Sequence, residues 1–337
     1  MRKLAVVLAA ILVAASFTSA ALAATTLSYA NFPPASTVPC VQMEQWAKEI
    51  EKRTSGAVKV QTYPGGTLLT AKNMLRGVQT GQADIGCISM SYQPGAFPFS
   101  FGMSQPLGFS SATVASVTLW ELFKKYEPAE FKDVKVITMF TSAPSNFMMK
   151  TPIKTLSDLR GVEVRGAGNI SEIIAAMGGV PVSMPMPDVP EAVQKGVVKG
   201  LLTSFEVLKD MNFAEMCRYQ TVANLPVYPF AVIMNKGTWD KLPGDVQKAI
   251  DDLALEQAEW TGKYWDAQVK TALDWSKEKF GIEVFTLSDA DMKAMNTAIA
   301  PLIEKWKAEA KTAGLDGDAI LKDIAALKAK NEAKYGK

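Results

Sequence analysis

Short apolar segments and helical segments alternate along the first part of this sequence. Three segments with the pattern of β-strands lie at 27–30, 58–63 and 84–89. The residues between them, at 39–52 and 71–80, place apolar side chains at the spacing of an amphipathic helix. Strands that alternate with helices predict a parallel sheet covered by helices on both faces. We therefore expect an α/β fold.

The start of the chain is predicted to be a secretion signal rather than part of the fold. Arg2 and Lys3 precede an apolar segment at 4–16, and the sequence Ala-Leu-Ala at 21–23 fits an A-x-A cleavage site. The apolar segment is too short to anchor the chain in a bilayer. Cleavage after about Ala23 leaves about 314 of the 337 residues, which suits two domains.

The charges of the remaining chain balance. The full sequence has 36 lysines and arginines and 34 aspartates and glutamates, and the signal removes Arg2 and Lys3 but no acid. A net charge of zero does not favour nucleic acid or an anionic membrane surface as a partner. We expect an exported protein that binds no nucleic acid and does not insert stably into the membrane.

The sequence contains no histidine. This absence removes the commonest general base, the usual partner of a nucleophilic Ser or Cys, and the commonest metal ligand. No group of cysteines or carboxylates has the spacing of metal ligands. The glycines at 166 and 168 lack the third glycine of a dinucleotide-binding loop. We therefore expect no cofactor and favour a function other than catalysis.

Three cysteines, Cys40, Cys87 and Cys217, are too few for a disulfide scaffold. In an oxidising compartment one pair could form a bridge, and Cys40 with Cys87 is then the preferred pair. Alternatively, all three are buried thiols that pack as small apolar side chains. The sequence leaves both interpretations open.

The segment 154–169 combines a helix start, a short strand and a glycine-containing turn. The strand pattern at 162–164 ends at Arg165, which precedes Gly-Ala-Gly-Asn and an apolar helical pattern at 170–177. In open α/β sheets, ligands bind beyond the carboxyl ends of the strands. Arginine can hold a carboxylate by two parallel hydrogen bonds. We therefore expect Arg165 to bind the carboxylate of a ligand.

The same segment resembles the sequence around the ligand-binding arginine of the TRAP-transporter solute-binding proteins of the DctP family. The resemblance rests on Leu-Ser-Asp-Leu-Arg-Gly-Val-Glu-Val-Arg at 156–165. It extends to Tyr-Pro-Gly-Gly-Thr-Leu at 63–68, Gly-Gln-Ala-Asp-Ile-Gly at 81–86 and Asn-Lys-Gly-Thr-Trp-Asp-Lys-Leu-Pro-Gly-Asp-Val-Gln at 235–247. The resemblance implies a periplasmic receptor that delivers a small organic acid to a TRAP membrane permease.

The resemblance also implies the two-domain fold of periplasmic binding proteins, with a hinged cleft between the domains. A long helical pattern at 245–280 is expected to span both domains, and two further helices are expected at 289–313 and 318–335. The chain is expected to cross between the domains near 142–145 and near 227–230. The expected parts are domain I at 24–144 and 229–288, domain II at 145–228, and C-terminal helices at 289–337.

The ligand cleft is expected to contain residues from both domains. In the sialic-acid branch of the family, a second arginine and an asparagine also contact the ligand. Here Ser145 stands at the position that matches the arginine, and Thr203 at the position that matches the asparagine. One carboxylate held by Arg165, with neutral hydrogen bonds from Asn146, fits this sequence better than a doubly anchored acid. The remaining candidate ligand contacts are Phe32, Ser89, Tyr92, Asn169, Ser204, Phe205, Glu206 and Phe230.

The aromatic candidates and the scarcity of other charges suggest a monocarboxylate with an apolar or aromatic body. Glu206 could receive an ammonium group of such a ligand. Simpler structural roles are an ion pair for Arg165, a core position for Phe205 and a solvated face for Glu206. Trp265, on the long helix, is expected to brace the domains rather than contact the ligand.

Two other functional interpretations remain. The same fold would serve a receptor for an ABC importer or for a chemosensory partner, and the fold alone does not separate these from a TRAP receptor. An exported enzyme that uses Asp188 or Glu206 as a catalytic carboxylate is less favoured, because the chain offers neither a histidine nor a metal-binding pattern.

Overall fold

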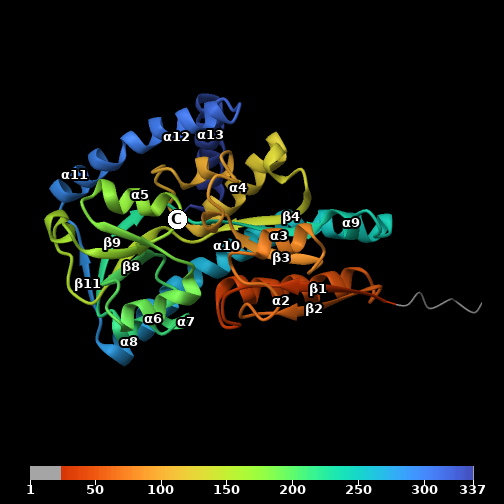
Figure 1. Ribbon diagram of the computed structural model, residues 1–337, viewed down its shortest axis with the longest axis horizontal. Coiled ribbons are helices and arrows are strands. Elements are labelled where there is room, and N and C mark those ends of the chain that lie inside the picture. The colour runs from red at the N-terminus through yellow and green to blue at the C-terminus, as the bar shows by residue number, and fades with distance from the viewer. Residues whose placement is uncertain (1–23, 337) are drawn as a thin grey trace, which may run out of the picture.

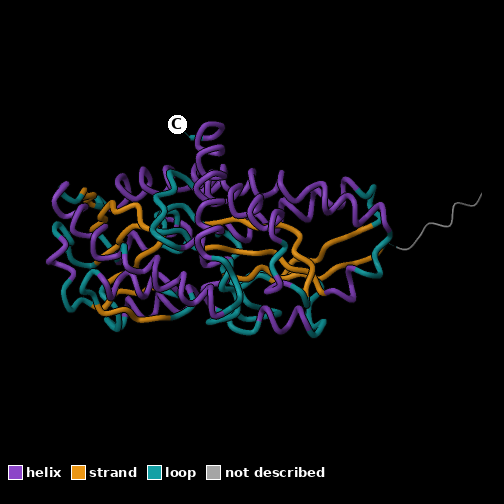
Figure 2. The backbone as a smooth tube through the Cα atoms, turned by 90° about the horizontal axis from the view of Figure 1, so that it is seen from above, coloured by secondary structure: helices purple, strands orange, loops and turns teal. Residues whose placement is uncertain are grey.

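The computed structural model describes residues 24–336, so the predicted signal at 1–23 lies outside the described residues. Within them the chain forms two β-sheets with helices on their faces, joined by the long helix α10 (Gly244–Phe280) (Figure 1). Seen from above, the strands lie toward the two ends of an elongated body (Figure 2). The two sheets and the long helix confirm the predicted α/β fold.

The first sheet has five strands in the order β2-β1-β3-β10-β4. β1 is parallel to β2 and β3, whereas β10 is antiparallel to β3 and β4. Two helices between the parallel strands provide the crossovers that parallel pairing needs. The strands and helices predicted between residues 27 and 89 are thus confirmed. The bounds are β1 (Thr25–Ala30), α2 (Val38–Arg53), β2 (Val58–Tyr63), α3 (Met74–Gln79), β3 (Ile85–Ser89), β4 (Val134–Thr141) and β10 (Pro229–Asn235).

The second sheet has six strands in the order β11-β9-β5-β8-β6-β7. β5 is antiparallel to β8 and β9, and β6 is parallel to β7 and β8. The strands are β5 (Ser145–Met149), β6 (Glu163–Gly166), β7 (Val180–Ser183), β8 (Gly200–Thr203), β9 (Tyr219–Leu225) and β11 (Glu283–Thr286). The helices within this part are α5 (Asn169–Ala176), α6 (Val189–Gln194), α7 (Val207–Asp210) and α8 (Phe213–Met216).

Besides the long helix α10, two short segments carry the chain between the sheets, residues 142–144 and residues 226–228. These two crossing segments are hydrogen-bonded to each other. The backbone N–H of Ser142 donates to the carbonyl oxygen of Tyr228 at 2.9 Å, and the N–H of Tyr228 donates to Oγ of Ser142 at 2.9 Å. Any hinge motion between the sheets therefore involves both segments together.

Helix α10 connects the two sheets. Its 37 residues give a length of about 55 Å at 1.5 Å per residue. It packs on α2 and on α4 (Ala112–Tyr126) beside the first sheet and on α7 beside the second. Gly262 lies where α10 meets α4, and a Cβ atom there would come within 2.5 Å of the Cα atom of Thr113. The close approach of these two helices therefore requires a residue without a side chain.

Two expected boundaries differ from the structure. β11 lies in the segment assigned to domain I, but it pairs with β9 of the second sheet. The length of α10 explains this, because the helix carries the chain to the far end of the molecule. The single helix expected at 289–313 is two helices, α11 (Asp289–Ile299) and α12 (Pro301–Thr312). Pro301 starts a new helix because it lacks the N–H group that a continuing helix needs.

The remaining helices are the short α9 and the three helices at the C-terminal end. α9 (Lys236–Trp239) follows β10, and α13 (Gly317–Tyr335) packs on α4. α11 contacts α5 of the second sheet, and Lys305 of α12 forms an ion pair with Glu172 of α5 at 2.5 Å. The C-terminal helices therefore touch both halves of the molecule, as Figure 1 shows.

All three cysteines are buried and free. Sγ of Cys40 donates to the carbonyl oxygen of Pro33 at 3.2 Å, and burial raises the pKa of this thiol to about 12. The preferred bridge between Cys40 and Cys87 is therefore not formed, and the alternative of three buried thiols describes the structure.

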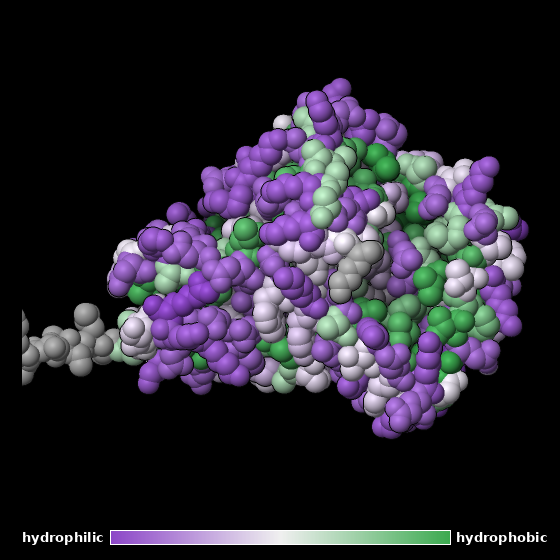
Figure 3. Space-filling model, turned by 180° about the vertical axis from the view of Figure 1, so that it is seen from behind, coloured by the Kyte–Doolittle hydropathy of each residue, from purple (hydrophilic) through white to green (hydrophobic). Residues whose placement is uncertain are grey.

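The surface in Figure 3 is mainly hydrophilic, with hydrophobic side chains gathered in separate areas. Among residues 24–336, no helix has both the length and the apolar character needed to cross a membrane.

Candidate functional site

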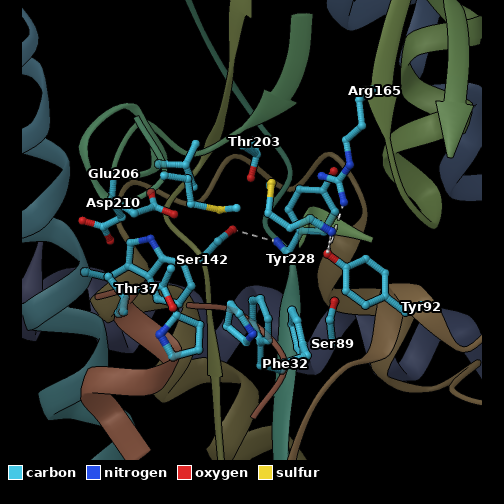
Figure 4. Close-up of a pocket in the computed structure, with 18 residues that line it drawn as sticks. Phe32, Thr37, Ser89, Tyr92, Ser142, Arg165, Thr203, Glu206, Asp210 and Tyr228 are labelled. Carbon is cyan, nitrogen blue, oxygen red and sulfur yellow. Dashed lines mark hydrogen bonds between the residues drawn. The ribbon is translucent and has the colours of Figure 1, made fainter. Parts of the chain in front are cut away.

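A cavity lies between the two sheets, beside both crossing segments and the middle of α10 (Figure 4). Its wall combines residues from the loop after β1, the end of β3, β6, β8, α7 and β10. Measured at the centres of water-sized spheres, its free volume is about 50 Å³. A single water needs about 10–15 Å³ on this measure. The cavity therefore has room for a small organic molecule.

Arg165 lies at one end of this cavity and is only 1% exposed. The pairing of β6 with β7 and β8 fixes its backbone. Nε and Nη2 donate to the carbonyl oxygen of Met184 at 3.0 and 2.8 Å. Within residues 24–336, Nη1 has no hydrogen bond and no acidic side chain forms an ion pair with the guanidinium. The positive charge of Arg165 is thus held in place by neutral groups.

Tyr92 connects the two sides of the cavity. It ends the short 3₁₀ helix that follows β3, and its hydroxyl accepts hydrogen bonds from Nη2 of Arg165 at 3.1 Å and from the N–H of Met186 at 3.0 Å. Because the hydroxyl accepts both bonds, its own hydrogen remains for a further partner. Oγ of Ser89, in the same wall, is buried and has no partner among the described residues. This end of the cavity therefore offers several donors, a chemistry suited to a carboxylate.

The aromatic ring of Tyr228 also lies beside Arg165. Its centroid is 5.7 Å from Cζ of Arg165, within the range of a cation–π contact. Burial acts to lower the pKa of Arg165, but the neighbouring Tyr92 and Tyr228 and, to a smaller extent, Asp188 raise it, and the net shift is upward. Burial raises the pKa of Tyr228 to about 12. The site thus contains a permanent cation beside a neutral phenol.

Aromatic side chains also line the cavity. Phe32 meets Tyr92 edge to face at 5.5 Å between ring centroids, and Phe230 lies 5.7 Å from Trp265. Nε1 of Trp265 donates to Oγ of Ser204 at 3.2 Å, so its polar atom already has a partner. These rings present apolar surface to a ligand.

Two carboxylates, Glu206 and Asp210, lie across the cavity from Arg165 (Figure 4). The N–H of Asp210 donates to the carbonyl oxygen of Glu206 at 3.0 Å, so α7 places the two side chains one turn apart on the same face. Glu206 is 4% exposed. Burial raises the pKa of Glu206, and it raises the pKa of Asp210 to about 7, with Glu206 adding to the shift.

Most of the residues predicted for the site line this cavity. They are Phe32, Ser89, Tyr92, Arg165, Thr203, Glu206 and Phe230. Glu206 is buried, so the solvated-face interpretation of this residue is wrong. Among the described residues Arg165 has no acidic partner, so the ion-pair interpretation does not describe it either.

Five of the predicted residues lie outside the cavity wall. Oδ1 of Asn146 accepts from the N–H groups of Ala223 and Asn224 at 2.8 and 2.9 Å, because the register between β5 and β9 shifts here and leaves these groups to a side chain. The other four have different contacts. Oγ of Ser145 donates to Pro226, Ser204 accepts from Trp265, Phe205 packs in the core of the second sheet, and Asn169 lines a separate recess with Glu172.

Several residues of the wall were missed. Trp265 was expected to be a brace only, but it lines the cavity. Asp210 follows Glu206 by four positions, and this helical spacing could have paired them. Tyr228 and Ser142 lie within the predicted crossing segments, where side chains from both domains must meet. Met186 carried no sequence signal, because its place depends on the packing of the loop after β7.

No group of three or more potential metal ligands occurs within the described part of the chain. Asp188, the alternative catalytic carboxylate, is exposed and lies outside the wall of this cavity. The geometry instead presents a cation, an apolar middle and two acids around a small space.

Comparison with known proteins identifies the family. The sequence model of the bacterial extracellular solute-binding protein family 7, DctP, matches residues 29–309. The 2,3-diketo-L-gulonate-binding periplasmic protein YiaO of Escherichia coli is 25% identical over 290 residues, which cover 85% of this chain and 88% of that protein. The C4-dicarboxylate-binding periplasmic protein DctP of Rhodobacter capsulatus is 25% identical, over 75% of this chain and 77% of that protein.

Solved structures give the same result. A TRAP periplasmic solute-binding protein from Desulfovibrio salexigens is 59% identical, with a TM-score of 0.83 over 94% of this chain and 98% of that chain. A marine metagenome TRAP solute-binding protein specific for aromatic acids, in complex with 3-hydroxybenzoate, is 28% identical, with a TM-score of 0.86 over 92% and 99%. The family and these neighbours are solute-binding proteins rather than enzymes. This chain therefore belongs to the DctP family of bacterial extracellular solute-binding proteins.

Proposed function

We propose that this protein is the periplasmic receptor of a TRAP transporter and binds a small carboxylic acid with an apolar or aromatic body. The observation that carries the proposal is Arg165. Its guanidinium is buried in the wall of a small cavity, yet no acid of the described chain forms an ion pair with it. A ligand carboxylate would supply the missing negative charge and accept from Nη1.

The neighbouring groups support the same ligand chemistry. The free hydrogen of the Tyr92 hydroxyl and Oγ of Ser89 are further donors at the Arg165 end of the cavity. Phe32, Phe230 and Trp265 provide apolar contact for the body of the acid. The relative that is 28% identical binds 3-hydroxybenzoate, and the relative that is 59% identical holds the C-terminus of a symmetry mate in its ligand-binding site.

The proposal is tested by measuring the binding of a panel of monocarboxylates to the purified mature protein by calorimetry. Replacing Arg165 by Ala removes the partner of a buried ligand charge, a change that typically costs about 2–5 kcal/mol. The dissociation constant should therefore rise by about 30-fold to several thousand-fold.

Arg160→Ala is the matched control, because Arg160 lies in the same sequence motif but is exposed. It should leave the affinity unchanged. Equal affinity of the native protein and the Arg165 variant would remove Arg165 as the anchor. If no acid binds, mass spectrometry of the small molecules released from denatured protein will show whether a ligand from the expression host already occupies the cavity.

The export and delivery steps have separate tests. We expect the exported protein to begin near Ala24, which N-terminal sequencing of periplasmic protein would measure. A neighbouring pair of genes for a small and a large multi-pass membrane protein would support delivery to a TRAP permease. A neighbouring ATPase gene would support the alternative, an ABC importer.

A further inference from the structure

We infer that the ligand is zwitterionic, with its carboxylate on Arg165 and a cationic nitrogen between Glu206 and Asp210. This inference rests on the proposed function and narrows its ligand class. It assigns a second recognition site, at the other end of the same cavity, to a protonated amine or another cationic nitrogen group.

The first observation is that Glu206 is buried and Asp210 half-buried, and that each has one carboxylate oxygen without a partner among the described residues. Oε2 of Glu206 and Oδ2 of Asp210 are buried and have no hydrogen-bond partner among the described residues. No lysine or arginine within residues 24–336 forms an ion pair with either carboxylate. Many acids on the surface, in contrast, form ion pairs with lysine or arginine. Buried carboxylates are normally paired or hydrogen-bonded, because an isolated buried charge is costly.

The second step is the position of these acids. Both line the cavity that Arg165 lines, and they lie on the opposite side of it (Figure 4). A ligand with a carboxylate alone would compensate Arg165 but would leave the unpartnered oxygens of the two acids without a donor. A ligand with a carboxylate at one end and a cationic nitrogen at the other would satisfy both ends.

The third step concerns the aromatic surface of the cavity. Trp265, Phe230 and Tyr228 line the same cavity. The Nε1 atom of Trp265 and the hydroxyl of Tyr228 already donate to protein oxygens, at 3.2 and 3.0 Å. The rings therefore offer mainly π-faces and edges, which tolerate both an apolar body and a nearby cation.

The test compares pairs of acids that have the same shape but differ in charge at one position. 5-Aminopentanoate is paired with hexanoate, and 4-(aminomethyl)benzoate with 4-ethylbenzoate. Phenylalanine is paired with 2-methyl-3-phenylpropanoate. In each pair a methyl group replaces the ammonium group. The three pairs place the cation at different distances from the carboxylate, so they also measure the separation that the site accepts.

We expect at least one zwitterion to bind the native protein about 10-fold or more tightly than the paired acid that carries a methyl group instead of the ammonium group. Calorimetry at pH 7.5 measures both affinities. The preference arises because the ammonium group compensates a carboxylate in the cavity wall, a type of pair whose disruption costs about 30-fold to several thousand-fold in affinity. The double variant Glu206→Gln, Asp210→Asn should lose this preference. Glu215→Gln, at an exposed acid on α8, is the matched control and should keep it.

The outcomes separate this inference from the proposed function. If the acids without an ammonium group bind through Arg165 as tightly as the zwitterions, the receptor function stands and the inference of a second recognition site is wrong. The same conclusion follows if no zwitterion binds, or if the preference survives in the double variant. If neither kind of acid binds and no ligand is released on denaturation, the proposed function itself fails. Circular dichroism of each variant establishes that it is folded.

Discussion

Asp210 titrates near neutral pH because of where α7 places it. Burial and the neighbouring Glu206 raise its pKa to about 7, while Lys209 acts in the opposite direction and Tyr264 lies close by. An aspartate in the unfolded chain has a pKa of about 3.9. Between these two values the folded protein binds more protons than the unfolded chain. The contribution of Asp210 to the free energy of unfolding therefore falls as the pH rises from about 4 to about 7.

This dependence gives a prediction for Asp210→Asn, which removes the titrating group and keeps its shape. The stability of the ligand-free variant relative to the native protein should increase between pH 5 and pH 8, as measured by urea unfolding at several pH values. Glu130 also has a pKa raised to about 7 by burial, but it is present in both proteins and cancels in the difference. If the difference in free energy of unfolding between the two proteins does not change with pH, the pKa of about 7 for Asp210 is contradicted.

At the scale of elements, the contact between α10 and α4 depends on one glycine. Gly262→Ala would place a Cβ atom 2.5 Å from the backbone of Thr113, so the two helices must separate. Overpacking of this kind costs roughly 1–3 kcal/mol, which exceeds the helix propensity that alanine gains. We expect a lower midpoint in thermal unfolding.

Gly244→Ala is the control for this change, because it lies at the start of the same helix with no atom within 4 Å of the added Cβ. It should change the free energy of unfolding by less than about 0.5 kcal/mol. If both variants lose the same stability, the close contact at Gly262 is not what limits the packing of α10.

The elements themselves were predictable from the sequence where the pattern is local. The strand at 162–164, the helix start before it and the long helix near 245–280 follow from periodicity and capping within a few residues. The hydrogen bonds of Asn146 could not be predicted in this way. They depend on a register shift between β5 and β9, which lie about 75 residues apart in sequence. The partners of Arg165 at the cavity also come from distant segments. Single-sequence patterns carry no information on such contacts.

At the scale of the whole molecule, Tyr92 links the two halves at the cavity. Its hydroxyl joins the first-sheet side to Arg165 and to the N–H of Met186. A ligand that contacts both sides of the cavity would favour the arrangement in which these hydrogen bonds form.

Tyr92→Phe should therefore weaken both ligand binding and closure. A hydrogen bond to a charged group contributes about 1.5–3 kcal/mol, so the dissociation constant should rise by about 10- to 150-fold. Small-angle X-ray scattering should record a smaller decrease in the radius of gyration on ligand addition than in the native protein. Tyr63→Phe, at the end of β2, serves as the control. An unchanged affinity in Tyr92→Phe would exclude the hydroxyl as a link between the two halves.

The place of Trp265 has an optical consequence. The sequence has seven tryptophans, but among the described residues Trp265 is the one that lines the cavity. Indole emission depends on the polarity and charge around the ring, and here the ring packs against Phe140 and Phe230 in the wall of a cavity that two acids also line. Occupancy of the cavity replaces water beside this ring, so the protein carries its own fluorescent reporter of ligand uptake and release.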